Sequence, residues 1–157
     1  MSQRILITAA ASGIGLEIAR AFAATGAKVF ITDINAAALE AATKTIPGLL
    51  TGVCDNSKRA DIEAMIPAAI EGLLGGLDVL VNNAGISGPT APVEEIDPGQ
   101  WEAVMSIDLT GTFHVTRLAI PHTRGTTARF SNSPACGQCW PNVSRRSAWL
   151  AGGYEAS

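Results

Sequence analysis

The sequence has little of several things that mark particular classes of protein. Charged residues make up only 16% of the 157 residues, against 47% hydrophobic residues, which excludes a disordered chain and a charge-driven binder. No apolar run approaches the roughly 20 residues of a membrane helix, and a pI near 5.3 argues against a nucleic-acid surface. Three cysteines are too few for a disulfide scaffold. The first residues enter an apolar strand without a signal peptide, so we expect a cytoplasmic protein with no membrane or nucleic-acid partner.

Lysine and acidic residues are scarce beyond Pro121. Residues 1–121 carry 7 basic and 13 acidic side chains, a net charge of −6. Residues 122–157 carry 4 arginines, no lysine and 1 acid, a net charge of +3, and they hold two of the three tryptophans. The length fits one domain with one core. The composition changes near residue 121, which divides the chain into two dissimilar segments.

Short apolar runs alternate along the chain with segments of helical periodicity. Glycine and proline end the expected helices; Ser57 is expected to cap the third helix and Pro67 to kink it. This alternation predicts an α/β fold, a Rossmann-type doubly wound parallel sheet with its ligand crevice at the carboxyl ends of the strands. The expected strands are 5–8, 28–32, 49–53 and 77–81, and the expected helices are 16–25, 36–45, 57–74 and 99–120.

A loop of small residues separates the first strand from the first helix. Ser12, Gly13, Ile14 and Gly15 place backbone N–H groups at a helix N-terminus, where they can hold the pyrophosphate of a dinucleotide. Asp33 follows Gly15 by 18 residues and fits a carboxylate that binds the adenosine ribose hydroxyls. Such a carboxylate repels a 2′-phosphate, which favours NAD over NADP. An ordinary glycine turn and a helix-capping aspartate are the alternatives.

The most specific string, Asn82-Asn83-Ala84-Gly85, follows the fourth strand. Together with the glycine loop, Asp33, Cys54-Asp55 and the stretch 107–113, it makes the sequence resemble the short-chain dehydrogenase/reductase family over about residues 3–121. The resemblance implies a Rossmann-type fold and hydride transfer between a nicotinamide cofactor and an alcohol or carbonyl substrate. We therefore expect residues 1–121 to form an NAD-binding part and residues 122–157 a divergent tail.

The resemblance also implies a role for each matching residue. It places the pyrophosphate on Ser12, Gly13, Ile14 and Gly15, the adenosine ribose on Asp33, the adenine amine on Asp55, and the riboses against Asn83, Ala84 and Gly85. Family catalysis uses a Tyr as general acid/base, a Lys that lowers the Tyr pKa from about 10, a Ser on the substrate oxygen and an Asn that holds a water. By order along the chain, the catalytic candidates are Tyr154 and Ser133, with Asp108 at the Asn position.

The sequence departs from the family pattern at several of these positions. Ala9 replaces the usual first glycine and would add roughly 1–2 kcal/mol of strain if the turn needs a positive φ. An ionised Asp108 can accept hydrogen bonds but cannot donate them, and its charge would raise the pKa of the Tyr; a solvent-facing Asp is the alternative. Tyr154 begins a Tyr-x-x-x-Lys string whose Lys would fall beyond residue 157, and an incidental tyrosine is the alternative. We expect a sheet that is incomplete at its C-terminal side, with no outer neighbour for the fourth strand, and the homo-oligomer usual for the family is doubtful for so short a chain.

Other functions stay open. A truncated or frame-disrupted relative would bind dinucleotide but be catalytically incomplete, and the change of composition near Pro121 fits a change of reading frame. A methyltransferase shares the glycine loop and the strand-end acid but does not explain the Asn-Asn-Ala-Gly string. Cys136 and Cys139 lack both the further ligands that zinc needs and the context of a thioredoxin-type site, so no metal is expected.

Overall fold

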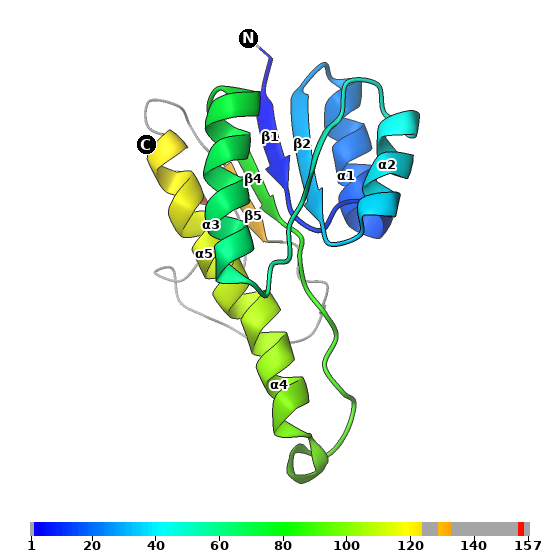
Figure 1. The fold of residues 1–157 in the computed structure, drawn as a ribbon, viewed down its shortest axis with the longest axis vertical. Helices are drawn as coiled ribbons and strands as arrows, with labels where there is room; N and C mark the ends of the chain where they lie inside the picture. The colour runs from blue at the N-terminus through cyan, green and yellow to red at the C-terminus, as the bar shows by residue number, and fades with distance from the viewer. Residues whose placement is uncertain (1, 124–128, 133–153, 156–157) are drawn as a thin grey trace.

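The computed structural model describes residues 2–123, 129–132 and 154–155 (Figure 1). Strands and helices alternate through residue 123, as the apolar periodicity predicts. The strands are β1 (Arg4–Ile7), β2 (Lys28–Asp33), β3 (Leu50–Val53), β4 (Val79–Asn82), β5 (Arg129–Asn132) and β6 (Tyr154–Glu155). The helices are α1 (Gly13–Ala24), α2 (Ala36–Thr45), α3 (Arg59–Ala68), η1 (Ala69–Leu74), η2 (Val93–Glu95), α4 (Pro98–Val104), η3 (Met105–Gly111), α5 (Thr112–Ala119) and η4 (Ile120–Thr123).

The strands form one sheet in the order β3-β2-β1-β4-β5-β6. β1 pairs in parallel with both β2 and β4, so the chain order reverses beside β1. In a doubly wound sheet, the carboxyl ends of the strands at such a reversal point form the ligand crevice. The fold is therefore the Rossmann-type parallel sheet that the sequence predicts.

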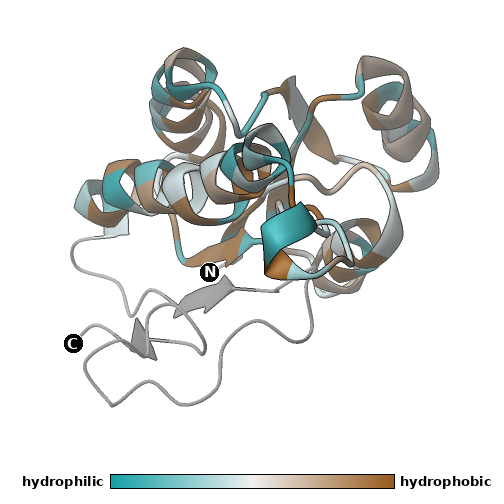
Figure 2. Cartoon of the chain, turned by 90° about the horizontal axis from the view of Figure 1, so that it is seen from below, coloured by the Kyte–Doolittle hydropathy of each residue, from teal (hydrophilic) through white to brown (hydrophobic). Residues whose placement is uncertain are grey.

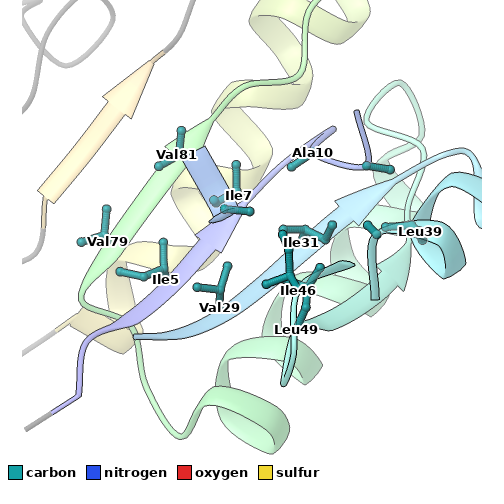
Figure 3. Close-up of a cluster of buried hydrophobic side chains, with 13 residues drawn as sticks. Ile5, Ile7, Ala10, Val29, Ile31, Leu39, Ile46, Leu49, Val79 and Val81 are labelled. Carbon is teal, nitrogen blue, oxygen red and sulfur yellow. The ribbon is translucent and has the colours of Figure 1, made fainter. Parts of the chain in front are cut away.

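Alternating side chains on the strands divide the core into two layers. Ile5 and Ile7 of β1 face one side, and Leu6 between them faces the other. The first side packs on α1 and α2, where Figure 3 shows the isoleucines and valines of β1, β2 and β4 together. The second side packs on α3 and α5 (Figure 1). In Figure 2 the strands that carry hydropathy colours are mainly brown and teal is concentrated on the helices, as expected for a buried sheet between two helical layers.

The fourth strand has an outer neighbour, so the expectation that it lacks one is wrong. β5 pairs in parallel with β4, with Asn132 opposite Asn82, and β6 pairs antiparallel with β5. Strand pairing uses backbone N–H and C=O groups, which every non-proline residue carries, so a segment poor in large apolar residues can still pair. The sheet thus continues past Pro121 at the level of the backbone.

Two expected helices change type along their length. The helix expected to kink at Pro67 ends as α3 at Ala68 and continues as the π-helix η1, because proline lacks the N–H that an α-helical bond requires. Ser57 does not cap α3, since its hydroxyl donates instead to Asp55. The helix expected over 99–120 is α4, the π-helix η3 and α5 in succession.

No helix among the described residues is long and apolar enough to cross a bilayer.

Candidate functional site

The turn after β1 has an unusual backbone. Ala9 has φ +49°, in the left-handed region that L-residues rarely adopt, and among the described residues it is the only non-glycine there. Gly13, at the start of α1, has φ +56°, and a Cβ placed on it would meet nothing within 4 Å. The turn therefore needs a positive φ at Ala9, and the space beside Gly13 is open.

The N-terminus of α1 has no internal cap. Ser12 is the N-cap residue, but its side chain makes no capping hydrogen bond, and the first turn holds no acidic residue. The first N–H groups of a helix have no helical partner and carry the positive end of its dipole. Ser12, Gly13 and Ile14 are exposed, so these donors face a position where an anion can bind.

Thr8 joins this turn to the loop after β4. The buried Thr8 hydroxyl oxygen accepts the N–H of Asn83 at 3.0 Å and that of Ala84 at 3.1 Å. The Asn83 side chain then donates through Nδ2 to the Ala9 carbonyl at 2.7 Å. Sequence reasoning gave Thr8 no role of its own, although a hydroxyl at the end of a buried apolar strand was a signal that it accepts a nearby backbone donor.

Gly15 lets these two loops approach each other. A Cβ on Gly15 would lie 2.5 Å from Nδ2 of Asn83 and 2.8 Å from Cα of Ala10. No side chain larger than hydrogen fits there without displacing the amide that bonds Ala9. The second glycine of the loop is thus explained by close packing, while the first, Gly13, is explained by its φ.

Asp33 ends β2 beside the same turn. Its Oδ2 accepts the Ala11 N–H and its Oδ1 accepts the Asn35 N–H, both at 3.0 Å. Asp33 is partly exposed, and a carboxylate has about four lone-pair positions, so two remain for a ligand. These bonds fix the orientation of the carboxylate beside the turn after β1.

Asp55 lies on the loop after β3. Its Oδ1 accepts both the hydroxyl and the N–H of Ser57, and Lys58 lies 3.3 Å from Oδ2. The Ser57 hydrogen bonds, with a smaller contribution from Lys58, hold the pKa of Asp55 below its ordinary value against the opposing effect of burial. The carboxylate is therefore ionised at neutral pH and already engaged by its own loop.

Asp108 lies in η3 and faces the loop after β4. Its Oδ1 accepts the Ile86 N–H at 2.9 Å, and burial raises the pKa of its carboxyl, with the Ile86 bond acting in the opposite direction. Asp108 is partly exposed, so one carboxylate oxygen binds the loop after β4 while the side chain still reaches solvent. Three residues on, Gly111 packs so closely on the Asn56 carbonyl that no Cβ fits.

Tyr154 and Ser133 are not placed at this site. The backbone of Tyr154 lies in β6, opposite Phe130 of β5, and is not helical. Ser133 and the Cys136–Cys139 pair lie outside the described residues. Among the described residues, no group of three or more His, Cys, Asp or Glu could hold a metal.

Comparison with known proteins decides the family. The family described as short chain dehydrogenase matches residues 3–137. The chain belongs to this family. The match confirms the resemblance, and it extends past Pro121.

The curated relatives of this chain are longer than the chain itself. It is 45% identical to the D-beta-hydroxybutyrate dehydrogenase of Cupriavidus necator over 121 residues, which are 74% of this chain and 46% of that protein. It is 35% identical to a borneol dehydrogenase of Lavandula x intermedia over 146 residues, 88% of this chain and 56% of that protein. The chain thus spans about half the length of the curated relatives that it matches.

Solved structures confirm the fold and leave the cofactor open. A 3-ketoacyl-(acyl-carrier-protein) reductase from Brucella melitensis, complexed with NADH, matches at a TM-score of 0.77 and 34% identity over 83% of this chain and 55% of that one. An actinorhodin polyketide ketoreductase with NADPH matches at a TM-score of 0.80 and 33% identity. That match covers 95% of this chain and 59% of the ketoreductase. The family's nicotinamide dinucleotide therefore occurs in both forms among these neighbours.

The residues present fit a dinucleotide. The uncapped N-terminus of α1 offers donors to a phosphate, and the open space over Gly13 leaves room for it. Asp33 is held at the neighbouring strand end, where an acceptor for ribose hydroxyls is needed.

Proposed function

We propose that this chain forms the dinucleotide-binding part of an NAD-dependent oxidoreductase that acts on an alcohol or carbonyl substrate. The observation that carries the proposal is the junction of Thr8, Ala9 and Asn83, which joins the loops after β1 and β4 beside an uncapped helix N-terminus. Two loops joined in this way form one preorganised surface for an extended ligand.

The bound dinucleotide would supply a hydride donor or acceptor at its nicotinamide. Ser12, Gly13, Ile14 and Gly15 present backbone donors to its phosphates, and Asn83, Ala84 and Gly85 line its riboses. Asp55 receives the adenine amine. Tyr154 and Ser133 remain the proposed catalytic residues by order along the chain, with Tyr154 as general acid/base.

Asp33 supports NAD as the preferred form. Its carboxylate can accept two ribose hydroxyls and would repel a 2′-phosphate. No Lys or Arg lies between Lys28 and Lys44 that could neutralise a phosphate from this strand end and the helix after it. We infer that NADH binds more tightly than NADPH.

A second candidate is a dinucleotide-binding relative without turnover. It is favoured by the position of Tyr154 on an edge strand, because a Tyr and a Lys four residues apart lie on one face only when the segment is helical. NAD affinity is common to both candidates, and turnover separates them.

Fluorescence titration with NADH and NADPH tests the cofactor site. We expect a lower Kd for NADH, and we expect Asp33→Asn to weaken NADH binding about tenfold while narrowing the difference from NADPH, since about 1.4 kcal/mol corresponds to tenfold in Kd. Glu40→Gln removes one negative charge from exposed α2 and should change neither Kd. If the unchanged chain binds neither dinucleotide, the proposal is wrong.

Turnover with a panel of small alcohols and carbonyls then tests the chemistry. Absorbance at the NADH band measures it directly. Binding without turnover on any substrate would support the second candidate.

A further inference from the structure

The loop after β3 is anchored on both sides of Asp55, the residue proposed to receive the adenine amine. On one side, the Cys54 N–H donates to the Asp33 carbonyl at 3.0 Å, which ties the loop to the end of β2. On the other side, the Lys58 N–H donates to the Asp55 carbonyl at 2.9 Å. The Asp55 N–H itself donates to Oδ2 of Asp61 at 3.2 Å. A side chain of α3 therefore holds the backbone at the centre of this loop.

The packing of α3 places Asp61 for this contact. Asp61 is the acidic residue in the first turn of the helix, and it directly precedes Ile62, which is fully buried in the core. The N-cap residue Lys58 makes no side-chain capping hydrogen bond. A carboxylate in the first turn of a helix commonly binds backbone N–H groups of the same terminus. Asp61 instead reaches back six residues, so its contact couples the loop to a helix that the core holds in place.

The direction of the Asp55 carboxylate depends on the same piece of backbone. Its Oδ1 accepts the N–H of Ser57 at 2.9 Å and the hydroxyl of Ser57 at 2.7 Å. These bonds hold the carboxylate relative to its own turn, because both donors belong to a residue only two positions away. The Asp61 contact, together with the chain through Lys58, then holds that turn relative to α3.

We propose that Asp61 is a positioning residue for the adenine-binding carboxylate, because by accepting the Asp55 N–H it fixes the Asp55 side chain at the adenine end of the site. Asp61 does not touch the ligand. The role needs an acceptor oxygen and not a negative charge, so asparagine can fill it and alanine cannot. The inference rests on the proposed function, which assigns Asp55 to the adenine amine.

Hydrogen exchange of the Asp55 amide, measured by NMR without cofactor, tests the contact alone. We expect its protection factor to fall about tenfold in Asp61→Ala, the order of one hydrogen bond to a charged group. In Asp61→Asn it should stay within about twofold of the unchanged protein, since the acceptor oxygen is kept. The Leu6 amide in buried β1 is the internal control for global stability.

Deamino-NADH, in which a carbonyl oxygen replaces the adenine amine, tests the role in binding. A carboxylate accepts a hydrogen bond from the amine and repels the carbonyl oxygen, so the unchanged chain should bind NADH about tenfold more tightly than deamino-NADH. Fluorescence titration measures both Kd values. In Asp61→Ala the ratio of the two should fall to within about twofold, and in Asp61→Asn it should be restored. A loss of stability alone would weaken both ligands equally and leave the ratio unchanged.

Glu63→Ala is the matched control on the same helix. It removes a carboxylate that pairs with Arg59 and Arg117 and has no contact with the loop after β3, so the ratio and the Asp55 exchange should both be unchanged. Asp61→Ser is the second variant should Asp61→Ala fail to fold. Its shorter side chain does not reach the Asp55 N–H, and it should give the same loss of the ratio as alanine.

The proposal is overturned if the variants that remove the acceptor leave Asp55 protection unchanged, if Asp55 changes only in step with Leu6, or if the ratio of the two Kd values persists without the acceptor. Equal affinity of the unchanged chain for NADH and deamino-NADH would also overturn it, because Asp55 would then not bind the amine. An unchanged chain that binds no dinucleotide refutes the proposed function instead, and the Asp55 exchange still decides whether Asp61 holds the loop.

Discussion

Ala9 holds a left-handed backbone conformation at the centre of the site. Its carbonyl receives the Asn83 amide and the N–H of the next residue, Ala10, donates to the Thr32 carbonyl at 2.9 Å. These two bonds hold the turn from both sides. They explain how a strained residue persists where glycine would be relaxed.

Ala9→Gly should stabilise the protein. Removing the Cβ relieves about 1–2 kcal/mol of left-handed strain, and the greater freedom of glycine in the unfolded chain offsets about 0.5–1 kcal/mol of this. We expect a net gain of about 0.5–1 kcal/mol in urea unfolding. Ala37→Gly in exposed α2 is the matched control and should lose about 1 kcal/mol. An equal loss in both variants would show that Ala9 is not strained.

At the level of single residues, the sequence motifs predicted the candidate side chains of the site but not the hydrogen bonds that join them. Gly13, Gly15, Asp33 and Asn83 follow from their spacing along the chain, and the structure brings all four to one end of the sheet. The Thr8 and Asp108 hydrogen bonds connect residues more than 20 positions apart, so no local pattern contains them.

An ion pair links the starts of β1 and β4 at the end of the sheet opposite the site. Arg4 donates through Nε to Asp78 Oδ2 at 2.9 Å and through a terminal nitrogen to Oδ1 at 2.8 Å, and also to the Gly75 carbonyl. Hydrogen bonds from Arg4 hold the pKa of Asp78 below its ordinary value. Since β1 and β4 flank the reversal point, this pair contributes to the alignment of the site loops.

Arg4→Lys should destabilise the protein by about 1–2 kcal/mol at neutral pH, because lysine keeps the charge but cannot form the bidentate contact. The lowered pKa means that the pair stabilises fully above the unfolded pKa of Asp78 and loses its effect as the pH falls through the folded pKa. The difference between variant and parent should therefore shrink below about pH 4.

Arg59→Lys is the control for this prediction, since the Arg59–Glu63 pair is exposed and the substitution should leave stability almost unchanged. Urea unfolding from pH 7 to pH 3 measures both. A pH-independent difference for Arg4→Lys would contradict the assignment.

At the level of elements, the predicted bounds of a helix were right where the sequence holds clear start and stop residues. Helix 36–45 lies where it was expected, because Asn35 caps it and Pro47-Gly48 follows it. The apolar spacing over 99–120 predicted one continuous helix, but the structure has the π-helix η3 between α4 and α5. Apolar spacing cannot distinguish α from π turns, since both bury the same residues within a few positions.

The reactivity of Cys54 is a measure of whether the whole molecule is folded. It lies in the core on the α3 and α5 side of the sheet, 2% exposed, and burial, with nearby Asp61 and Asp55, raises the pKa of its thiol to about 11. Thiolates react and thiols do not. The folded chain should therefore protect Cys54 from reagents in two ways, because its side chain is buried and because its thiol stays protonated.

In a Cys136→Ser, Cys139→Ser background, we expect Cys54 to resist a thiol reagent in the folded protein at pH 8 and to react fully in urea. The midpoint of labelling should coincide with the midpoint seen by circular dichroism, because the thiol lies in the main core. Rapid labelling of the native protein would show that the layer between β3, α3 and α5 opens locally.

The sequence alone determined the α/β class, the family and the candidate residues of the proposed dinucleotide surface. It could do so because strand and helix periods, turn glycines and the Asn-Asn-Ala-Gly string are local patterns of chemistry. Tertiary structure alone decided the outer partner of β4, the edge position of Tyr154, the strain at Ala9 and the Asp108–Ile86 contact. Each of these depends on backbone groups that every residue carries, and only folding determines which of them meet.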